Sequence, residues 1–340
     1  MKKIFITLCV LLTLVGCSNN VSDNDTNTEI KEEQNNDIKE EKINWFVDPK
    51  STTRPFAVMI NCHNNALPQS DINKAYLVYE LMVEGGITRM LALFKDTNAV
   101  KIGSVRSARS QYLGYVLEND AIYVSAGGSS EAIREIDKLK INRIDVDNNL
   151  YGMRDKTLNR DWEHTLFTSI DLLKKGANNY KYRTTSDSGL VFKYSESEVD
   201  LSKYSSSTKA NKISIKYSDY RTSKYEYDET SKSYLRFMNS KENIDLTSKE
   251  QYKVKNIIVY GLKYTSFSSD NYYGYQKIDN IGSGEGYYIT NGYAIPITWK
   301  KDSLSSKTIY KIKETGEELV LNNGNTYVQI YPKGNDFKIN

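Results

Sequence analysis

Residues 76–130 read YLVYELMVEGGITRMLALFKDTNAVKIGSVRSARSQYLGYVLENDAIYVSAGGSS, and this segment carries the clearest structural pattern in the chain. Its apolar runs, at 91–94, 100–102 and 121–124, alternate with glycines at 85–86, 103 and 127–128. Glycine supplies the backbone freedom that tight turns at strand ends require. The pattern therefore predicts a sheet, and ligand sites on such sheets gather where the strands end.

Strands and helices alternate around this segment, as they do in α/β domains. Apolar runs bounded by turn residues predict strands, whereas apolar residues at helical spacing predict helices. We expect strands at 54–60, 87–94, 100–102 and 121–125, and helices at 71–84, 107–118, 129–139 and 168–175. The helix at 129–139 begins with a capping sequence at Ser129. These elements predict an N-terminal α/β domain over residues 45–185.

From residue 213 the apolar pattern changes to a period of two, which predicts strands. Strand-like pieces occur at 213–217, 225–227, 234–237, 256–260, 286–290, 294–299 and 326–330. Turn pairs such as Asn291-Gly292 and Asn323-Gly324 separate these pieces. The expected fold class is α+β. A mixed sheet with flanking helices forms the N-terminal lobe, residues 186–212 form a linker, and residues 213–340 form a mainly antiparallel β lobe.

The N-terminus has the pattern of a secretory signal. Lys2 and Lys3 precede an apolar run at 4–15, which is shorter than the roughly 20 apolar residues of a membrane-spanning helix. The run ends in Leu-Val-Gly before Cys17, which resembles a bacterial lipoprotein processing box. We therefore expect a signal peptide at 1–16 and lipid modification of Cys17. An ordinary signal peptide, cleaved at another position, is the alternative.

Residues 17–44 are predicted to be a disordered acidic tether. Between residues 18 and 44 eight acids face three lysines and no aromatic residue occurs, so too little apolar surface is available to offset chain entropy. A flexible segment of this length spans about 30 Å. Cys9 leaves with the signal and Cys17 is acylated, so Cys62 remains alone and no internal disulfide is expected.

Many segments of the folded part resemble the YerB-like family of bacterial lipoproteins, whose two regions are catalogued as a domain of unknown function, DUF3048. The segments that carry the resemblance lie at 54–55, 58–61, 68–70, 80, 84–89, 103–109, 126–129, 234–238, 255–259, 284–286, 299–301 and 323–326. The chain differs where the family has proline, at Ser104, and around His164. The resemblance implies an α/β lobe, a β-rich lobe and surface anchoring, and it implies no reaction.

Charged residues punctuate the glycine-rich segment and form the strongest site candidate. Arg89, Arg106 and Arg109 carry planar guanidinium groups, which suit carboxylates and phosphates. With Glu80 and Glu84, which share a face of the expected helix, they are predicted to bind an anionic ligand. The alternative is a structural ion-pair network, because buried charges need partners.

Other residues are weaker candidates for a functional role, and four form a second tier: Arg54, His164, Ser129 and Trp299. Ser129 follows two glycines at an expected helix N-terminus, a place where anions bind. Trp299 belongs to a tyrosine-rich lobe that can stack on sugars. Cys62 and His63 are adjacent on a strand and point to opposite faces, which argues against a thiol nucleophile. No metal-ligand spacing occurs, and no cofactor is expected.

We expect a lipid-anchored protein on the outer face of a bacterial cytoplasmic membrane. It would bind an anionic cell-wall polymer or wall-synthesis proteins such as penicillin-binding proteins, and would not be an enzyme. The alternative is an envelope enzyme, either a glycan hydrolase that uses the glutamates or a phosphotransferase. Basic residues are scattered along the sequence and the formal net charge is only +3, which disfavours nucleic-acid binding.

Overall fold

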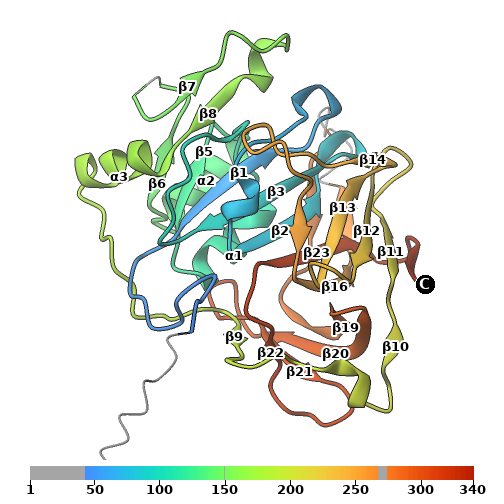
Figure 1. Ribbon diagram of the computed structural model, residues 1–340. Helices are drawn as coiled ribbons and strands as arrows, with labels where there is room; N and C mark the ends of the chain where they lie inside the picture. The colour runs from blue at the N-terminus through green and yellow to red at the C-terminus, as the bar shows by residue number, and fades with distance from the viewer. Residues whose placement is uncertain (1–42, 149, 267–273) are drawn as a thin grey trace, which may run out of the picture. The chain divides into compact units, whose positions relative to one another are not determined.

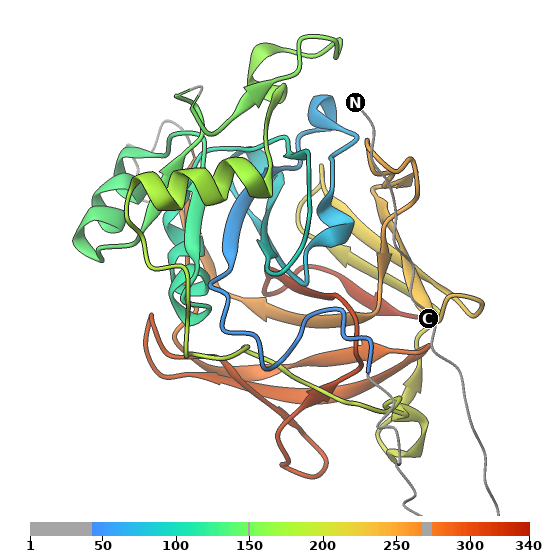
Figure 2. The ribbon, with the colours of Figure 1, turned by 60° about the vertical axis from the view of Figure 1, so that its left-hand side comes forward.

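The computed structural model describes residues 43–148, 150–266 and 274–340. The predicted signal peptide, Cys17 and nearly all of the predicted tether therefore lie outside the described residues. Residues 43–340 form one compact unit, drawn in Figures 1 and 2. Among the described residues, no helix combines the length and apolar character needed to cross a bilayer.

A large mixed sheet runs through the unit in the order β10-β20-β19-β16-β23-β2-β3-β1-β5-β6, with β21 paired to β20. The bounds are β1 Phe56–Asn61, β2 Leu77–Met82, β3 Thr88–Phe94, β5 Ile122–Ser125, β6 Arg143–Asp145, β10 Thr208–Lys209, β16 Asn256–Leu262, β19 Gly282–Thr290, β20 Tyr293–Lys301, β21 Ile309–Ile312 and β23 Thr326–Pro332. Strand β1 pairs parallel with β5, and β23 pairs parallel with both β2 and β16. The mixed sheet predicted for the N-terminal lobe is confirmed.

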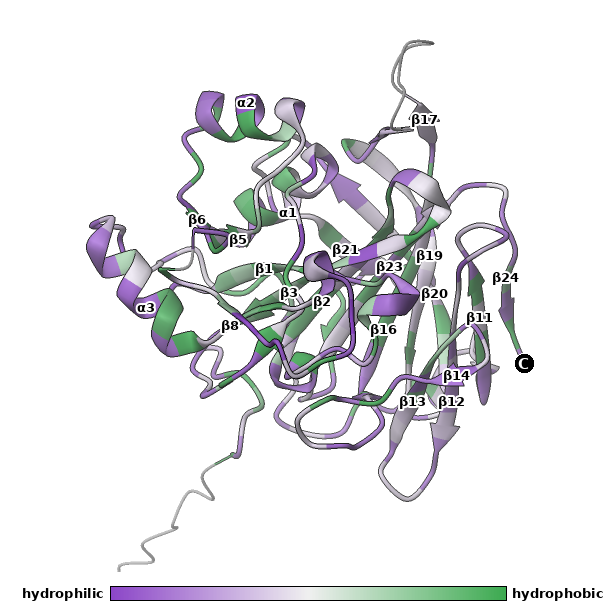
Figure 3. Cartoon of the chain, turned by 90° about the horizontal axis from the view of Figure 1, so that it is seen from above, coloured by the Kyte–Doolittle hydropathy of each residue, from purple (hydrophilic) through white to green (hydrophobic). Residues whose placement is uncertain are grey.

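Three helices cover the two faces of this sheet: α1 Leu113–Glu118, α2 Ser130–Lys138 and α3 Ile170–Asn179. Helices α1 and α2 pack on the face that carries Ala57 and Met59, whereas α3 packs on the face of Val58 and Ile60. In Figure 3, α2 and α3 each show hydrophobic and hydrophilic sides, as helices on a sheet must. Ser129 and Ser169 cap α2 and α3, so these two helices begin where the sequence predicts.

A second sheet, entirely antiparallel, has the order β14-β13-β12-β11-β24, with β15 paired to β13. Its strands are β11 Lys212–Lys216, β12 Thr222–Asp228, β13 Ser233–Met238, β14 Lys241–Glu242, β15 Lys253–Val254 and β24 Phe337–Ile339. Its inner side chains join the core that contains Val58 and Ile60. The predicted antiparallel strands of the C-terminal half are confirmed.

Short elements complete the unit: strands β4 Ile102–Gly103, β7 Met153–Arg154, β8 Leu166–Thr168, β9 Lys193–Tyr194, β17 Tyr264–Ser266, β18 Gln276–Ile278 and β22 Val320–Leu321, and 3-10 helices η1 Asn64–Ala66, η2 Ile72–Lys74, η3 Glu84–Gly86, η4 Ser110–Tyr112, η5 Trp162–His164 and η6 Leu201–Lys203. Strand β9 pairs with β22 and β10 pairs with β20, so residues 186–212, predicted as a linker, contribute to two sheets. Both hydrophobic cores contain residues from both predicted domains.

The helix predicted at 71–84 is wrong. Residues 77–82 form β2, flanked by the short helices η2 and η3. Strand β2 lies between β3 and β23 and is buried on both faces, so its apolar run is continuous rather than alternating. The strand predicted at 100–102 is the short strand β4 at 102–103, which pairs with β8 outside the large sheet.

Candidate functional site

The arginines predicted to bind a ligand are mostly occupied by one carboxylate. Gly85 and Gly86, both with φ near +69°, turn the chain after β2 and bring Glu84 back over β3. Arg89 Nη2 donates to Glu84 Oε1 at 2.8 Å, and Arg109 Nε donates to Glu84 Oε2 at 2.9 Å. Arg109 Nη2 also contacts Oε1. The three side chains form a closed network at the end of β2.

Two further donors of this network go to the backbone of the 107–109 segment, whereas Arg89 Nε is buried without a hydrogen-bond partner among the described residues. Arg89 Nη1 donates to the carbonyl of Ser107, and Arg109 Nη1 donates to the carbonyl of Ala108 at 2.8 Å. Burial and the neighbouring Arg109 lower the pKa of Arg89 to about 10. For Glu84, burial raises the pKa, but the two arginines outweigh it and the pKa lies below its usual range. The network therefore holds the loop in place and occupies most of the guanidinium donors that were predicted to bind a ligand.

Glu80 belongs to a different cluster. Its carboxylate accepts from Arg236 Nη2 of β13 at 2.9 Å and from Thr88 Oγ1 at 2.7 Å, and Ser223 Oγ lies 3.2 Å away. Both Glu80 and Arg236 have no exposed side-chain surface. Burial raises the pKa of Glu80, but Arg236 and Thr88 bring it below its usual range. The predicted pairing of Glu80 and Glu84 on one helix face is wrong, because β2 replaces that helix.

Arg236 is a residue that the sequence analysis did not select as a partner of Glu80. The signal was present, because Tyr234, Arg236 and Met238 are the inward-facing positions of β13. A charged residue at an inward position of a strand requires a buried countercharge. The Glu80–Arg236 pair consequently joins the large sheet to the second sheet.

Arg106 lies apart from the other two arginines. It donates to Glu163 at 3.1 Å, and 28% of its side chain is exposed. Beside it the chain's two histidines stack, with a ring-centre distance of 4.9 Å between His63 and His164. His164 Nδ1 lies 2.9 Å from Asn61 Nδ2, and burial together with His63 lowers the pKa of His164. Arg106 is the predicted contact that keeps substantial exposure.

Cys62 and His63 point in opposite directions, as expected for adjacent strand-end residues. Cys62 is buried in the core between the two sheets, where burial and Glu80 raise the pKa of its thiol to about 12. His63 Nδ1 instead accepts from the backbone of Asn65 and caps η1. A neutral buried thiol is a poor nucleophile, so this pair offers no catalytic centre.

The second-tier residues have structural partners. Arg54 donates to the carbonyl of Asp120 and to Asn142 Oδ1, both at 2.7 Å. Ser129 caps α2. Trp299 is only 5% exposed, and its ring lies against Gly284, where an added Cβ would come within 2.7 Å of Nε1. Trp299 therefore belongs to the core, and its small exposed part lines a pocket of about 610 Å³ between β19, β20 and β21.

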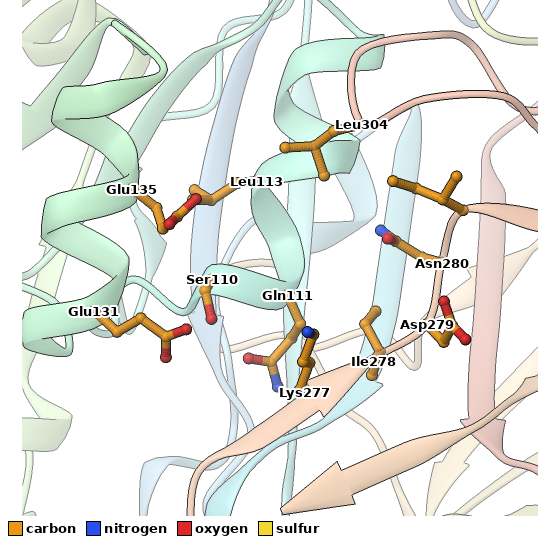
Figure 4. Close-up of a pocket in the computed structure, with 11 residues that line it drawn as sticks. Ser110, Gln111, Leu113, Glu131, Glu135, Lys277, Ile278, Asp279, Asn280 and Leu304 are labelled. Carbon is orange, nitrogen blue, oxygen red and sulfur yellow. The ribbon is translucent and has the colours of Figure 1, made fainter. Parts of the chain in front are cut away.

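A pocket of about 410 Å³ lies between α2, η4 and β18, close to Leu304 (Figure 4). Glu131 and Glu135 are one helical turn apart and point into it. Burial and Glu135 raise the pKa of Glu131, the one carboxylate of the described residues for which an upward shift is found. None of the five predicted contact residues lines this pocket. In the described part of the chain, no group of three or more histidine, cysteine, aspartate or glutamate side chains has metal-binding geometry.

The outer side of the second sheet carries lysines, and we call it the lysine face. Its five lysines are Lys212, Lys216, Lys224, Lys253 and Lys338. Strand register places Lys338, Ser214 and Lys224 in one row across the sheet, and Lys212, Glu226, Leu235 and Lys253 in the next. Along the sequence these basic residues are scattered, and the fold gathers them on one side of the sheet. The alternation Lys-Ile-Ser-Ile-Lys at 212–216 was the signal that some of them share a face.

The lysine face is positively charged and accessible. Glu226, Asp228 and Glu242 are the acids at its outward positions, and Asp219 pairs with Lys216 at 2.9 Å. Lys212 reaches Glu226 at 3.4 Å, whereas no carboxylate of the described residues lies within 4.0 Å of Lys224, Lys253 or Lys338. The excess of basic over acidic residues also lies in the C-terminal half of the folded part. Residues 43–200 hold 20 basic and 20 acidic residues, and residues 201–340 hold 21 and 15.

Comparison with known proteins gives consistent matches. The "Protein of unknown function (DUF3048) N-terminal domain" matches residues 44–183, and the corresponding C-terminal domain matches residues 213–328. The chain is 27% identical over 343 residues to "Putative lipoprotein YerB" of Bacillus subtilis (strain 168), covering 98% of this chain and 96% of that protein. The crystal structure of the Bacillus subtilis YerB protein superposes with a TM-score of 0.72 at 23% identity, covering 85% of this chain and 94% of the other. The last match supports the α+β fold.

Proposed function

The chain belongs to the DUF3048 family, and from this premise we propose that it is a lipid-anchored protein that binds an anionic polymer of the bacterial cell envelope. A relative that aligns over nearly its whole length bears the name of a lipoprotein. The segment before Cys17 has the form of a lipoprotein signal. Anchoring through Cys17 would place the folded unit on the outer face of the cytoplasmic membrane.

The lysine face is the observation that carries the binding proposal. A polymer with repeated phosphates or carboxylates needs cations spread over a surface rather than one rigid pocket. Neighbouring strands are about 4.8 Å apart, so Lys338 and Lys224, two strands apart in one row, are separated by about 10 Å. Lysine ammonium groups on flexible stems adapt to variable anion spacing, whereas arginine forks select one planar geometry. Leu235 and Phe237 are half-buried between the lysines and add apolar contact.

The two glutamates predicted from the sequence lack the property that a hydrolase acid needs. A glycan hydrolase needs a carboxyl group with a raised pKa as its acid. The pKa values of Glu80 and Glu84 are both lowered, and Glu80 is inaccessible to solvent. The enzyme alternative therefore gains no support at these residues. Wall-synthesis proteins are the alternative partners, and co-sedimentation with cell-wall material distinguishes them from polymer binding.

The test is co-sedimentation of residues 43–340 with purified cell-wall material, with the supernatant assayed for released fragments. The variant is Lys224→Glu/Lys253→Glu/Lys338→Glu, and the control is Lys138→Glu/Lys156→Glu/Lys175→Glu, which changes the net charge equally at exposed positions elsewhere. At about 0.5 kcal/mol for each lost exposed ion pair, the variant should bind about tenfold more weakly.

If both triple variants lose binding equally, the effect depends on net charge alone, which would contradict a specific role of the lysine face. Release of fragments by the unsubstituted protein would instead support the enzyme. Absence of binding would remove the polymer and leave protein partners. Arg106→Ala in the same assay tests the contact predicted from the sequence, and we expect its effect to be smaller than that of the lysine variant.

A further inference from the structure

A separate pocket of about 580 Å³ opens between the start of β1, the end of β3 and helix α3. Its lining contains three basic side chains and three apolar ones: Arg54, Lys95, Lys174, Phe56, Phe94 and Ile170. Helix α3 is fixed against the end of β3 because Ile170 N donates to the carbonyl of Ala99 at 2.9 Å. The volume lies within the roughly 300–1,000 Å³ typical of small-molecule sites.

Lys95 is the unusual group in this pocket. The residue is only 7% exposed, and its Nζ donates to the carbonyl of Ser51 at 2.7 Å. Asp96 and Asp48 act on this ammonium electrostatically, but no carboxylate of the described residues lies within 4.0 Å of it, although an ammonium has three hydrogen-bond donors. Burial lowers the pKa of Lys95. A buried cation without a carboxylate in contact is costly, and an anion in the pocket would lower that cost.

Lys174 supplies a second cation from the opposite wall. It follows Ile170 by one turn of α3, so both side chains lie on the helix face that lines the pocket. It too lacks a carboxylate within 4.0 Å among the residues that the structure describes. Arg54 adds positive potential, but its guanidinium is already held by Asp120 at 3.6 Å and by backbone carbonyls.

The floor of the pocket is apolar. Phe56, Phe94 and Ile170 are all buried core residues that line it. Asp96 is the one acidic residue of the lining, so the lining carries more basic than acidic groups. Ligand sites commonly combine such an apolar lining with a few polar groups that orient the ligand.

We propose that this pocket binds a small organic anion, with its carboxylate or phosphate between Lys95 and Lys174 and its apolar part against the accessible edges of Phe56 and Ile170. The site is built from β1, β3 and α3, whereas the lysine face is built from β11 to β15 and β24. The inference is therefore independent of polymer binding, and either can fail without the other.

The test is a ligand-observed NMR titration of residues 43–340 with phenyl phosphate, benzoate and inorganic phosphate. Residues 43–340 form one unit with its own cores, so they serve as the folded protein. Ligands of this size are expected to bind with dissociation constants in the millimolar range. At least one aromatic anion should bind about tenfold more tightly than inorganic phosphate, and the better of the two shows which head group the site prefers.

Two variants and one control locate the site. Lys174→Gln changes an exposed residue and should weaken binding of the aromatic anion about threefold or more, while Lys95→Met should abolish it. Lys175→Gln, the next residue on α3, does not line the pocket and should bind like the unsubstituted protein. Absence of binding by both aromatic anions, equal affinity for inorganic phosphate, or equal effects of Lys174→Gln and Lys175→Gln would overturn the proposal.

Discussion

Loss of the Glu80–Arg236 pair should destabilise the protein more than loss of any exposed ion pair. Glu80→Gln leaves the Arg236 guanidinium without a countercharge at a site with no solvent exposure. Removing one partner of a buried pair costs about 3–5 kcal/mol. For roughly 300 residues at about 2.1 cal/mol/K each, the entropy of unfolding is about 0.6 kcal/mol/K, so about 4 kcal/mol lowers Tm by about 6 °C.

The assay is urea and thermal unfolding of residues 43–340, followed by circular dichroism. Glu226→Gln is the matched control, because Glu226 pairs with Lys212 at 3.4 Å on the exposed lysine face. It should cost less than about 0.5 kcal/mol. Glu80→Gln combined with Arg236→Met should recover part of the loss, since it removes both charges. A cost below about 1 kcal/mol for Glu80→Gln would refute the reasoning that this pair joins the two sheets.

Three further predictions follow from the site and the anchor. The pKa of Glu84 is lower in the folded protein than in the unfolded one, so ionised Glu84 stabilises the fold above its unfolded pKa. This stabilisation is lost as the pH falls through the folded pKa. Glu84→Gln should therefore flatten the acid side of the curve of stability against pH, and an unchanged curve would count against the network. Cys62, with a thiol pKa of about 12, should react with a thiol reagent at pH 8 only after unfolding, so rapid native labelling would contradict its burial. Cys17→Ser should abolish palmitate labelling and release the protein into the medium, whereas retained labelling would place the lipid elsewhere.

Local sequence patterns predicted the helices and strands that a few neighbouring residues determine. Ser129 and Ser169 mark the starts of α2 and α3 because a helix cap is determined by a few neighbouring residues. The strands β1, β3 and β5 are bounded by turn residues, and the period-two strands of the C-terminal half show their own alternation. These parts of the fold required no knowledge of distant partners.

Strand β2 could not be predicted from neighbouring residues alone. Its spacing of apolar residues fits a helix, but β23 pairs with it from residue 326, about 250 positions further along the chain. The role of Glu80 was unpredictable for the same reason, because its partner Arg236 lies 156 positions further along the chain, in the second sheet. The turn at Gly85 and Gly86 was predicted, but the closed Glu84 network also depends on the element before that turn being a strand and not a helix. Pairing between distant strands therefore decided which charges are buried.

The most direct test of the central claim is the dissociation constant of residues 43–340 for purified, soluble anionic wall polymer, measured at low and high ionic strength. We predict that binding weakens with salt, because exposed charges are screened beyond about 10 Å at 0.1 M. We further predict that Lys224→Glu/Lys253→Glu/Lys338→Glu loses about tenfold in affinity at low salt, while the Lys138/Lys156/Lys175 control does not. Binding that is insensitive to both salt and the lysine-face substitutions would contradict the account.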